Sequence, residues 1–178
     1  YAFEKHTLQA LIEQLPRRTF YRHTFHPQVL NALPFQWAGF RQKVRYTYLL
    51  DCQPDPAALR DGFKRTLRTD LKKAEQLATV QTCTDAAPLF RLYQQSLGRS
   101  GLSPASEAAF ERLFTALHLH QSGQAWLATD RQSGAPHAGL LLAYDHQRAY
   151  AVVSGADPAY KASCAVYLLF WEAILWCH

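Results

Sequence analysis

The sequence predicts an α+β fold, in which helices flank a mixed, mostly antiparallel sheet. Three apolar runs lie close together near the C-terminus, WLATD, HAGLLLAYD and RAYAVVSG, and short polar turns separate them. Strands joined by such turns pair antiparallel. A polar loop, ADPAYKAS, then leads into an apolar helix, CAVYLLFWEAILW. Helical spacing of apolar residues also recurs upstream, so helices and a meander of strands share one chain.

The first fifty residues predict one helix and two strands. Residues 3–15 carry leucines at helical spacing, and Pro16 ends this helix. Residues 19–25 alternate aromatic and polar side chains, as a half-buried strand does. Residues 43–51 form the second predicted strand, and its apolar and aromatic side chains share one side: Val44, Tyr46, Tyr48 and Leu50.

A long helix is predicted after residue 55. Asp55 and Pro56 are typical of a helix start, the first as N-cap and the second as the first helical residue. Apolar residues continue at helical spacing as far as Ala78, which predicts one uninterrupted helix. Residues 79–84 then read as a short strand.

Two more helices precede the strand meander. The first covers residues 85–97 and ends at Gly98. The second starts at Ser103-Pro104 and runs to about Gln121, with phenylalanines and leucines on its inner face.

The C-terminal third predicts the core of the fold. Residues 125–154 should form three antiparallel strands of one sheet, and the helix over residues 162–177 should pack on a face of that sheet. This helix is apolar on nearly every side. We therefore expect both Trp171 and Leu175 to be buried.

The composition is that of an ordinary soluble globular protein. Apolar residues make up 48% of the 178 residues and charged residues 19%. The sequence shows no run long enough to span a membrane and no signal-peptide pattern, so we expect a cytoplasmic protein. The four cysteines lie far apart, as reduced thiols would, and the histidines lack further ligands at metal-binding spacing. No metal site is expected.

Three segments resemble one family of enzymes. They are GFRQKVRYTYLLD (residues 39–51), the basic stretch FKRTLRTDLKKAEQ (residues 63–76) and the region from Gly134 to Ile174. Together they resemble the Fem-type, peptidoglycan-bridge (FemAB-like) branch of the GNAT N-acyltransferase superfamily. The resemblance implies a tandem of two GNAT-like halves. Residues 1–52 would be the C-terminal part of the first half, and residues 53–178 a second half truncated at its C-terminus.

The resemblance also implies an activity. Such enzymes move an acyl or aminoacyl group from an activated donor, aminoacyl-tRNA or acyl-CoA, to an amine, which can belong to a cell-wall precursor. The donor is a co-substrate, so no permanently bound cofactor is expected, and tRNA is a candidate partner. A non-catalytic GNAT-fold module that binds tRNA or another anionic ligand is the alternative. The sequence leaves the oligomeric state open.

The loop between the last strand and the last helix is the predicted donor site. Backbone amides of the strand could polarise an acyl carbonyl, and amides at the helix start could hold phosphate. The loop lacks the glycine-rich sequence of ordinary acetyl-CoA users, and the alternative is a plain strand–helix turn. The predicted donor-binding residues are Val152, Val153, Gly155, Lys161, Ser163, Cys164 and Ala165.

Basic residues form the second predicted site. Lys64, Arg68 and Lys72 lie one helical turn apart and could cradle phosphates of a nucleotide-sugar or a tRNA. An ordinary solvated helix face is the alternative. Arg45 and Tyr46 on the preceding strand are further candidates for binding an acceptor or an anion. The formal net charge of +5 agrees with an anionic partner.

Three side chains are candidates for moving protons. Glu172 lies in an otherwise apolar helix, where burial would raise its pKa and suit it to act as a base. The alternative for Glu172 is a structural role as a hydrogen-bond acceptor. Tyr150 and Tyr48 carry hydroxyl groups that could carry a proton. For Tyr48 the alternative is aromatic packing over the sheet.

Overall fold

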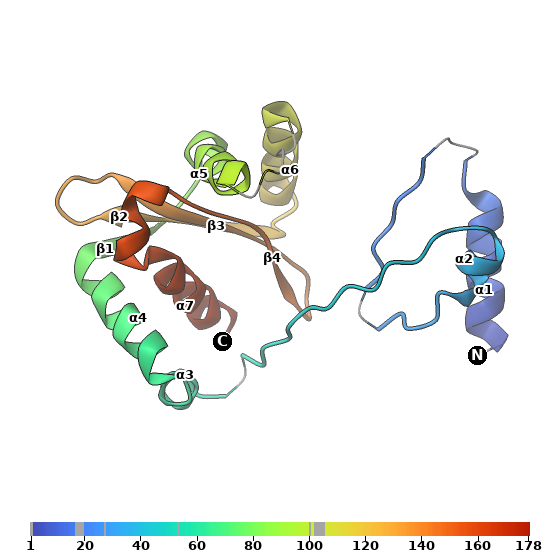
Figure 1. Ribbon diagram of the computed structural model, residues 1–178, viewed down its shortest axis with the longest axis horizontal. Coiled ribbons are helices and arrows are strands. Elements are labelled where there is room, and N and C mark those ends of the chain that lie inside the picture. Colours follow the sequence, from blue (N-terminus) through green and yellow to red (C-terminus); the bar gives the residue numbers. More distant parts are fainter. Residues whose placement is uncertain (1, 17–19, 27, 53, 100, 102–105) are drawn as a thin grey trace. The chain divides into compact units, whose positions relative to one another are not determined.

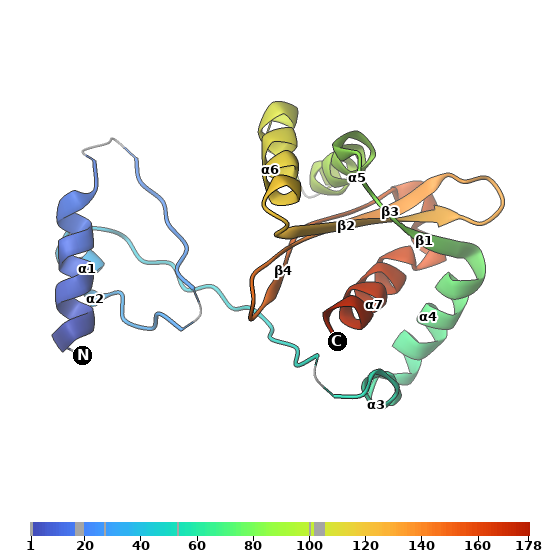
Figure 2. The ribbon, with the colours of Figure 1, turned by 180° about the vertical axis from the view of Figure 1, so that it is seen from behind.

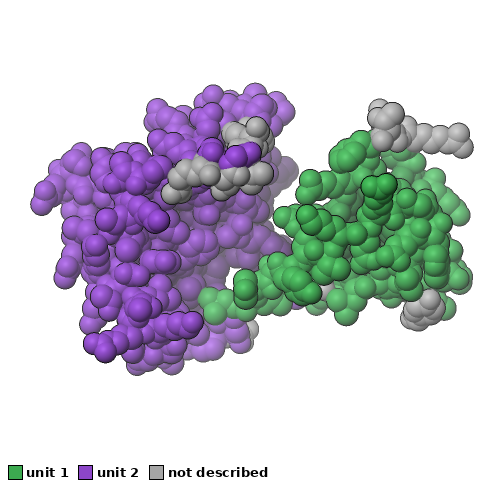
Figure 3. All heavy atoms as spheres, viewed as in Figure 1, with its two compact units in different colours: residues 1–50 green, residues 51–178 purple. Residues whose placement is uncertain are grey.

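The computed structural model describes residues 2–16, 20–26, 28–52, 54–99, 101 and 106–178. The chain divides into two compact units, residues 1–50 and residues 51–178 (Figure 3). Each unit is described by itself below.

The described part of the first unit contains two helices and an aromatic cluster. Helix α1 (Ala2–Gln14) agrees with the predicted helix, and α2 (Leu33–Trp37) is a single turn with a proline at its start. Phe35 is the centre of the cluster, because its ring packs edge-to-face on Phe25 and Phe40, at 5.1 and 5.4 Å between centroids.

Neither strand predicted for the N-terminal region is present among the described residues. Residues 43–51 lack strand structure, and Tyr46 and Tyr48 are almost fully exposed. Alternation favours a strand only where a neighbour completes the hydrogen-bond ladder and a core covers one face. The described residues of this unit supply neither. The two predictions were therefore wrong, although the helix before them was correct.

The second unit is built on one antiparallel sheet (Figures 1 and 2). Its strands follow chain order, β1 (Ala78–Thr82), β2 (Gly123–Asp130), β3 (Pro136–Tyr144) and β4 (Ala149–Ala156). Every pair of neighbours is antiparallel, as short turns require. The predicted α+β fold and the meander are confirmed, and the described sheet is wholly antiparallel rather than mixed.

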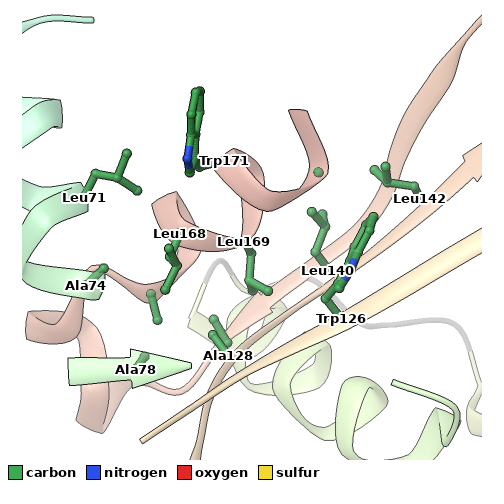
Figure 4. Packing of buried hydrophobic residues seen from close by; sticks show 13 residues of the cluster. Leu71, Ala74, Ala78, Trp126, Ala128, Leu140, Leu142, Leu168, Leu169 and Trp171 are labelled. Atoms are coloured by element: carbon green, nitrogen blue, oxygen red, sulfur yellow. The ribbon is translucent and has the colours of Figure 1, made fainter. Parts of the chain in front are cut away.

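Helices cover both faces of the sheet. Figure 1 shows α5 (Ala86–Arg99) and α6 (Glu107–Leu119) on one face, and α4 (Arg65–Leu77) and α7 (Ala165–Cys177) on the other. Alternate residues of each strand therefore enter two different cores. The core under α4 and α7, shown in Figure 4, includes Leu71, Trp126, Leu140, Leu169 and Trp171. The core under α5 and α6 includes Leu89, Phe110, Leu127, Leu141 and Val153.

The long helix predicted after residue 55 is broken in two. Helix α3 (Pro56–Asp61) begins as predicted, since the Asp55 carboxylate accepts a hydrogen bond from the Ala58 amide at 3.3 Å. It ends at Gly62, and Lys64 has extended backbone angles before α4 begins. Gly62 itself keeps right-handed helical angles, φ −70° and ψ −11°, so the chain leaves the helical conformation after it, at Lys64.

Other boundaries also differ from the prediction, among them the end of α5, which lies at Arg99, beyond the predicted end at Gly98. Helix α6 begins with Ser106 as its N-cap, whose hydroxyl accepts from the Ala109 amide at 3.3 Å. The predicted start at Ser103-Pro104 lies outside the described residues. Residues 158–163 form a 3₁₀-helix, η1 (Pro158–Ser163), so α7 starts at Ala165 and not near residue 162.

Helix α7 is buried on one side only. Trp171 is 8% exposed, as predicted, but Leu175 is 40% exposed, which contradicts the expected two-sided burial. Tyr167, Phe170 and Trp176 are likewise partly exposed. The sheet and α4 cover one face of the helix, and its outer face stays apolar without a described covering element. None of the described helices is both long and apolar enough to cross a membrane.

Candidate functional site

Strand β4 provides an open, irregular edge. It pairs with β3 alone, so its other edge has no ladder partner in the described part of the chain. Leu141 pairs with Val153 and Leu142 with Ala151, which leaves Val152 as an extra residue in a β-bulge. The Val152 side chain is 44% exposed, whereas Val153 points into the core under α5. A bulge on an open edge leaves backbone amides available for a ligand.

The turn from β4 into α7 is ordered by short-range hydrogen bonds. The Asp157 carboxylate caps η1 by accepting from the Ala159 amide at 2.8 Å. The Ser163 hydroxyl donates to the Tyr160 carbonyl at 2.8 Å and accepts from the Ala165 amide at 3.4 Å. Ser163 is therefore buried and structural, while Lys161 is exposed and could meet a ligand.

Cys164 is the N-cap of α7. Its backbone is left-handed, with φ 58°, and its side chain makes no capping hydrogen bond. A non-glycine residue with such an angle is uncommon and marks a sharp reversal of the chain. Ala165, the first residue of α7 and another of the predicted donor-binding residues, is buried.

Gly155 has a packing role that the sequence did not predict. A Cβ atom at this position would lie 2.4 Å from the carbonyl carbon of Leu92 and 2.4 Å from the amide nitrogen of Tyr93. Helix α5 thus crosses β4 with its backbone against the strand. Next to this crossing, the Ser96 hydroxyl accepts from the Ala156 amide at 2.8 Å and lies 3.3 Å from the Ala156 carbonyl, to which it donates.

The buried His137 side chain packs against η1. The His137 ring stacks on the Tyr160 ring, with 4.1 Å between centroids and 21° between planes, and His137 is 3% exposed. Its Nε2 lies 3.5 Å from a carboxylate oxygen of Asp130, yet neither ring nitrogen has a hydrogen-bond partner among the described residues. Sequence reasoning missed this contact, because 23 residues separate the two rings along the chain and no local pattern links them.

Two α4 side chains lie beside the start of α7. Burial raises the pKa of the Cys164 thiol, the carboxylate of Asp70 raises it further, and the ammonium of Lys73 opposes this effect. The signs of these effects show that a carboxylate and an ammonium group both act on the Cys164 position. Lys73, the residue after Lys72 in α4, is therefore close enough to the β4–α7 turn to act on it electrostatically.

The basic row itself lies around the break between α3 and α4. Arg68 and Lys72 line a cavity there, and Arg68 donates to the Asp61 carbonyl at 3.3 Å. Lys64 is the N-cap of α4 and does not line this cavity. The structure thus joins two of the three predicted residues in one site and leaves Lys64 outside it.

The predicted catalytic residues are spread over the chain. Tyr150 lies on β4, two residues before the bulge, and its side chain is 38% exposed. Glu172 is half-buried on α7 and makes no hydrogen bond or ion pair with a described residue, and both its role as a base and its role as a structural acceptor stay predictions. Tyr48 belongs to the first unit, as do Arg45 and Tyr46. These three side chains are exposed.

The described residues contain no group of three or more histidine, cysteine or carboxylate side chains that could hold a metal ion. What the β4–α7 turn offers instead is backbone: an open strand edge, a bulge, and the first amides of a helix without a side-chain cap. Such an arrangement can polarise a carbonyl group and hold an anionic group beside it.

Comparison with known proteins relates this architecture to one family. The sequence model of the acetyltransferase (GNAT) domain family matches residues 61–178, and no curated protein matches the chain. The crystal structure of FemX is similar in fold, with a TM-score of 0.63 at 12% identity. The similarity covers 70% of this chain and 48% of FemX, so the chain spans about half the length of that protein. The matched region holds the whole sheet with all four helices that cover it, and the chain belongs to the acetyltransferase (GNAT) domain family.

Proposed function

We propose that the chain is a GNAT-type N-acyltransferase that moves an acyl or aminoacyl group onto an amine. The donor is an activated ester or thioester, aminoacyl-tRNA or acyl-CoA, which acts as a co-substrate. Membership of the GNAT family supports acyl transfer in general. The resemblance of three sequence segments to the Fem-type branch supports an amine of a cell-wall precursor as acceptor. The same resemblance supports the proposal that residues 1–52 end a first GNAT-like half.

The observation that carries the proposal is the bulged, open edge of β4 beside the η1–α7 turn. In the proposed reaction the acceptor nitrogen attacks the acyl carbonyl carbon and a C–N bond forms. The carbonyl oxygen becomes an oxyanion, which a backbone amide near Val152 stabilises. The C–S bond of a thioester or the C–O bond of an ester then breaks, and the leaving group takes a proton while the amine loses one.

Charged side chains near the turn suit the donor's phosphates. Lys161 is exposed on η1, and the ammonium group of Lys73 on α4 acts electrostatically on the Cys164 position at the start of α7. Together with the partial positive charge at the start of α7, they would hold phosphate groups while the acyl group extends along β4.

Proton transfer is assigned first to Tyr150, because it shares the open strand with the bulge. Its hydroxyl would donate a proton to the departing thiolate or alkoxide. Glu172 and Tyr48 are further candidates for accepting the proton of the amine.

The test is a transfer assay with purified protein, a panel of CoA thioesters and aminoacyl-tRNAs, and amine acceptors. Val152→Pro removes one backbone donor at the bulge, and Val152→Ala is its matched control because the side chain is exposed. We expect the proline variant to lose about 10²-fold to 10³-fold in rate and the alanine variant to lose little. Circular dichroism and the melting temperature would verify that both variants fold.

A second pair of variants tests the proton carrier. Tyr150→Phe should slow transfer, whereas Tyr167→Phe, which removes a similarly exposed hydroxyl from α7, should not. A folded Val152→Pro variant with the normal rate would contradict the assignment of the carbonyl site. Tight tRNA binding without turnover for any donor would support the non-catalytic alternative instead.

A further inference from the structure

The break between α3 and α4 creates a cavity of about 370 Å³. Because Gly62 ends α3, the end of that helix lies beside the first turns of α4 and not in line with them. Four cationic side chains and one carboxylate border the cavity; its lining residues are Arg60, Asp61, Arg65, Arg68, Thr69 and Lys72. The volume is at the small end of the range for ligand sites.

Two of the arginines are fixed by the protein itself. A single nitrogen of Arg60 contacts both carboxylate oxygens of Glu75, at 2.8 and 3.0 Å, and its guanidinium lies 5.7 Å from the ring centroid of Trp171. Arg68 donates to the Asp61 carbonyl at 3.3 Å, which ties it to the end of α3. These contacts limit the rotamers of both side chains, so less entropy is lost when an anion binds.

The other two cations have no such partners. Neither Arg65 nor Lys72 makes a side-chain hydrogen bond or ion pair with a described residue. With Arg68 they place three positive charges on one face of α4, and like charges at this spacing destabilise a helix. Asp61 offsets only part of this charge. An anion in the cavity would relieve the repulsion.

We propose that this cavity binds the diphosphate group of a small anionic ligand. Guanidinium groups recognise phosphate through two parallel hydrogen bonds, and three of the four cations here are arginines. Arg65 and Lys72 are about 10 Å apart along the helix axis, which is more than one phosphate group spans. The small volume favours a compact diphosphate over a polynucleotide, which needs a longer basic groove.

The test measures binding of two probes, inorganic pyrophosphate and ADP, by isothermal titration calorimetry on the full chain. The double variant Arg65→Glu/Lys72→Glu removes the two cations without internal partners. Its matched control, Arg91→Glu/Arg112→Glu, makes the same change in net charge on exposed sites of α5 and α6, across the sheet. We expect the Kd of both probes to rise at least tenfold in the first variant and less than twofold in the second.

A conservative variant tests the geometry. Arg65→Lys keeps the charge but loses the planar fork, so it should weaken binding several-fold. Equal weakening by the two double variants would show a general field effect and overturn the proposal. Retained binding of the probes in Arg65→Glu/Lys72→Glu would also overturn the proposal. Tight binding of a single-stranded RNA oligonucleotide, together with no binding of pyrophosphate or ADP, would overturn it as well. Because Arg65 and Lys72 line this cavity, the change in Kd between the two double variants reports on the cavity and not on the donor site proposed at the β4–α7 turn.

Discussion

Replacing Gly155 by alanine tests the close approach of the α5 backbone to β4. The added methyl group would lie 2.4 Å from two backbone atoms of α5, in Leu92 and Tyr93. Backbone atoms cannot rotate aside as a side chain does, so α5 must move away from β4 or the strand must bend. Overpacking of this kind costs about 2–3 kcal/mol. For a chain of this size, that corresponds to a fall in melting temperature of roughly 5–10 °C.

The assay is urea denaturation followed by circular dichroism, with Gly98→Ala as the matched control. Gly98 also lies in α5, but a Cβ atom there would meet nothing within 4 Å. Its replacement should stabilise the protein by about 0.5–1 kcal/mol, since alanine favours the helix. The two glycine-to-alanine substitutions are thus expected to change the free energy of unfolding in opposite directions. Equal stabilities of Gly155→Ala and the unmodified chain would refute the described crossing of α5 over β4.

Three further predictions concern single side chains. His137→Phe should keep or raise the stability of the fold, because it preserves the stack on Tyr160 and removes two buried nitrogens without hydrogen-bond partners. His137→Ala should cost about 2 kcal/mol, and thermal melts of both variants compare the two. Hydrogen bonds, first of all from the Ser133 amide, hold the pKa of Asp130 below its usual value, so its stabilising effect is complete at neutral pH and is lost as the pH falls through the lowered pKa. Melting temperatures between pH 7 and pH 2 should therefore fall less steeply in Asp130→Asn than in the unmodified chain, and equal slopes would contradict this. Cys83 is only 4% exposed, and burial raises the pKa of its thiol. It should therefore react last of the four cysteines with a thiol reagent at pH 7, and peptide mapping of a partly labelled sample measures this order.

The elements that the sequence predicted well carry their own signals. The side chains of residues 125–154 alternate between two cores, in strands joined by polar turns. This pattern specifies the register of an antiparallel meander. Asp55 was recognisable as an N-cap because the cap is a local contact, three residues long.

The elements that failed depend on distant partners. Residues 43–51 alternate like a strand, but the first unit offers no described strand to pair with them. The stripe of apolar residues before Ala78 continues across Gly62, so periodicity alone could not reveal the break. The same holds for the candidate site. The loop at residues 155–165 was visible in the sequence, whereas the stack of His137 on Tyr160 arises only when β3 and η1 meet.

The pair of hydrogen bonds between Ser96 and Ala156 sets a limit on what the open edge of β4 can accept. One hydroxyl serves both the amide and the carbonyl of Ala156, as a neighbouring strand would. An extended peptide that aligned along β4 would find free backbone groups near the bulge but none at this end. Ser96 thus occupies the two backbone groups of Ala156, which a strand added along β4 could not use for pairing. Replacing Ser96 by alanine would remove this hydroxyl partner and extend the open edge of β4 by one residue, Ala156.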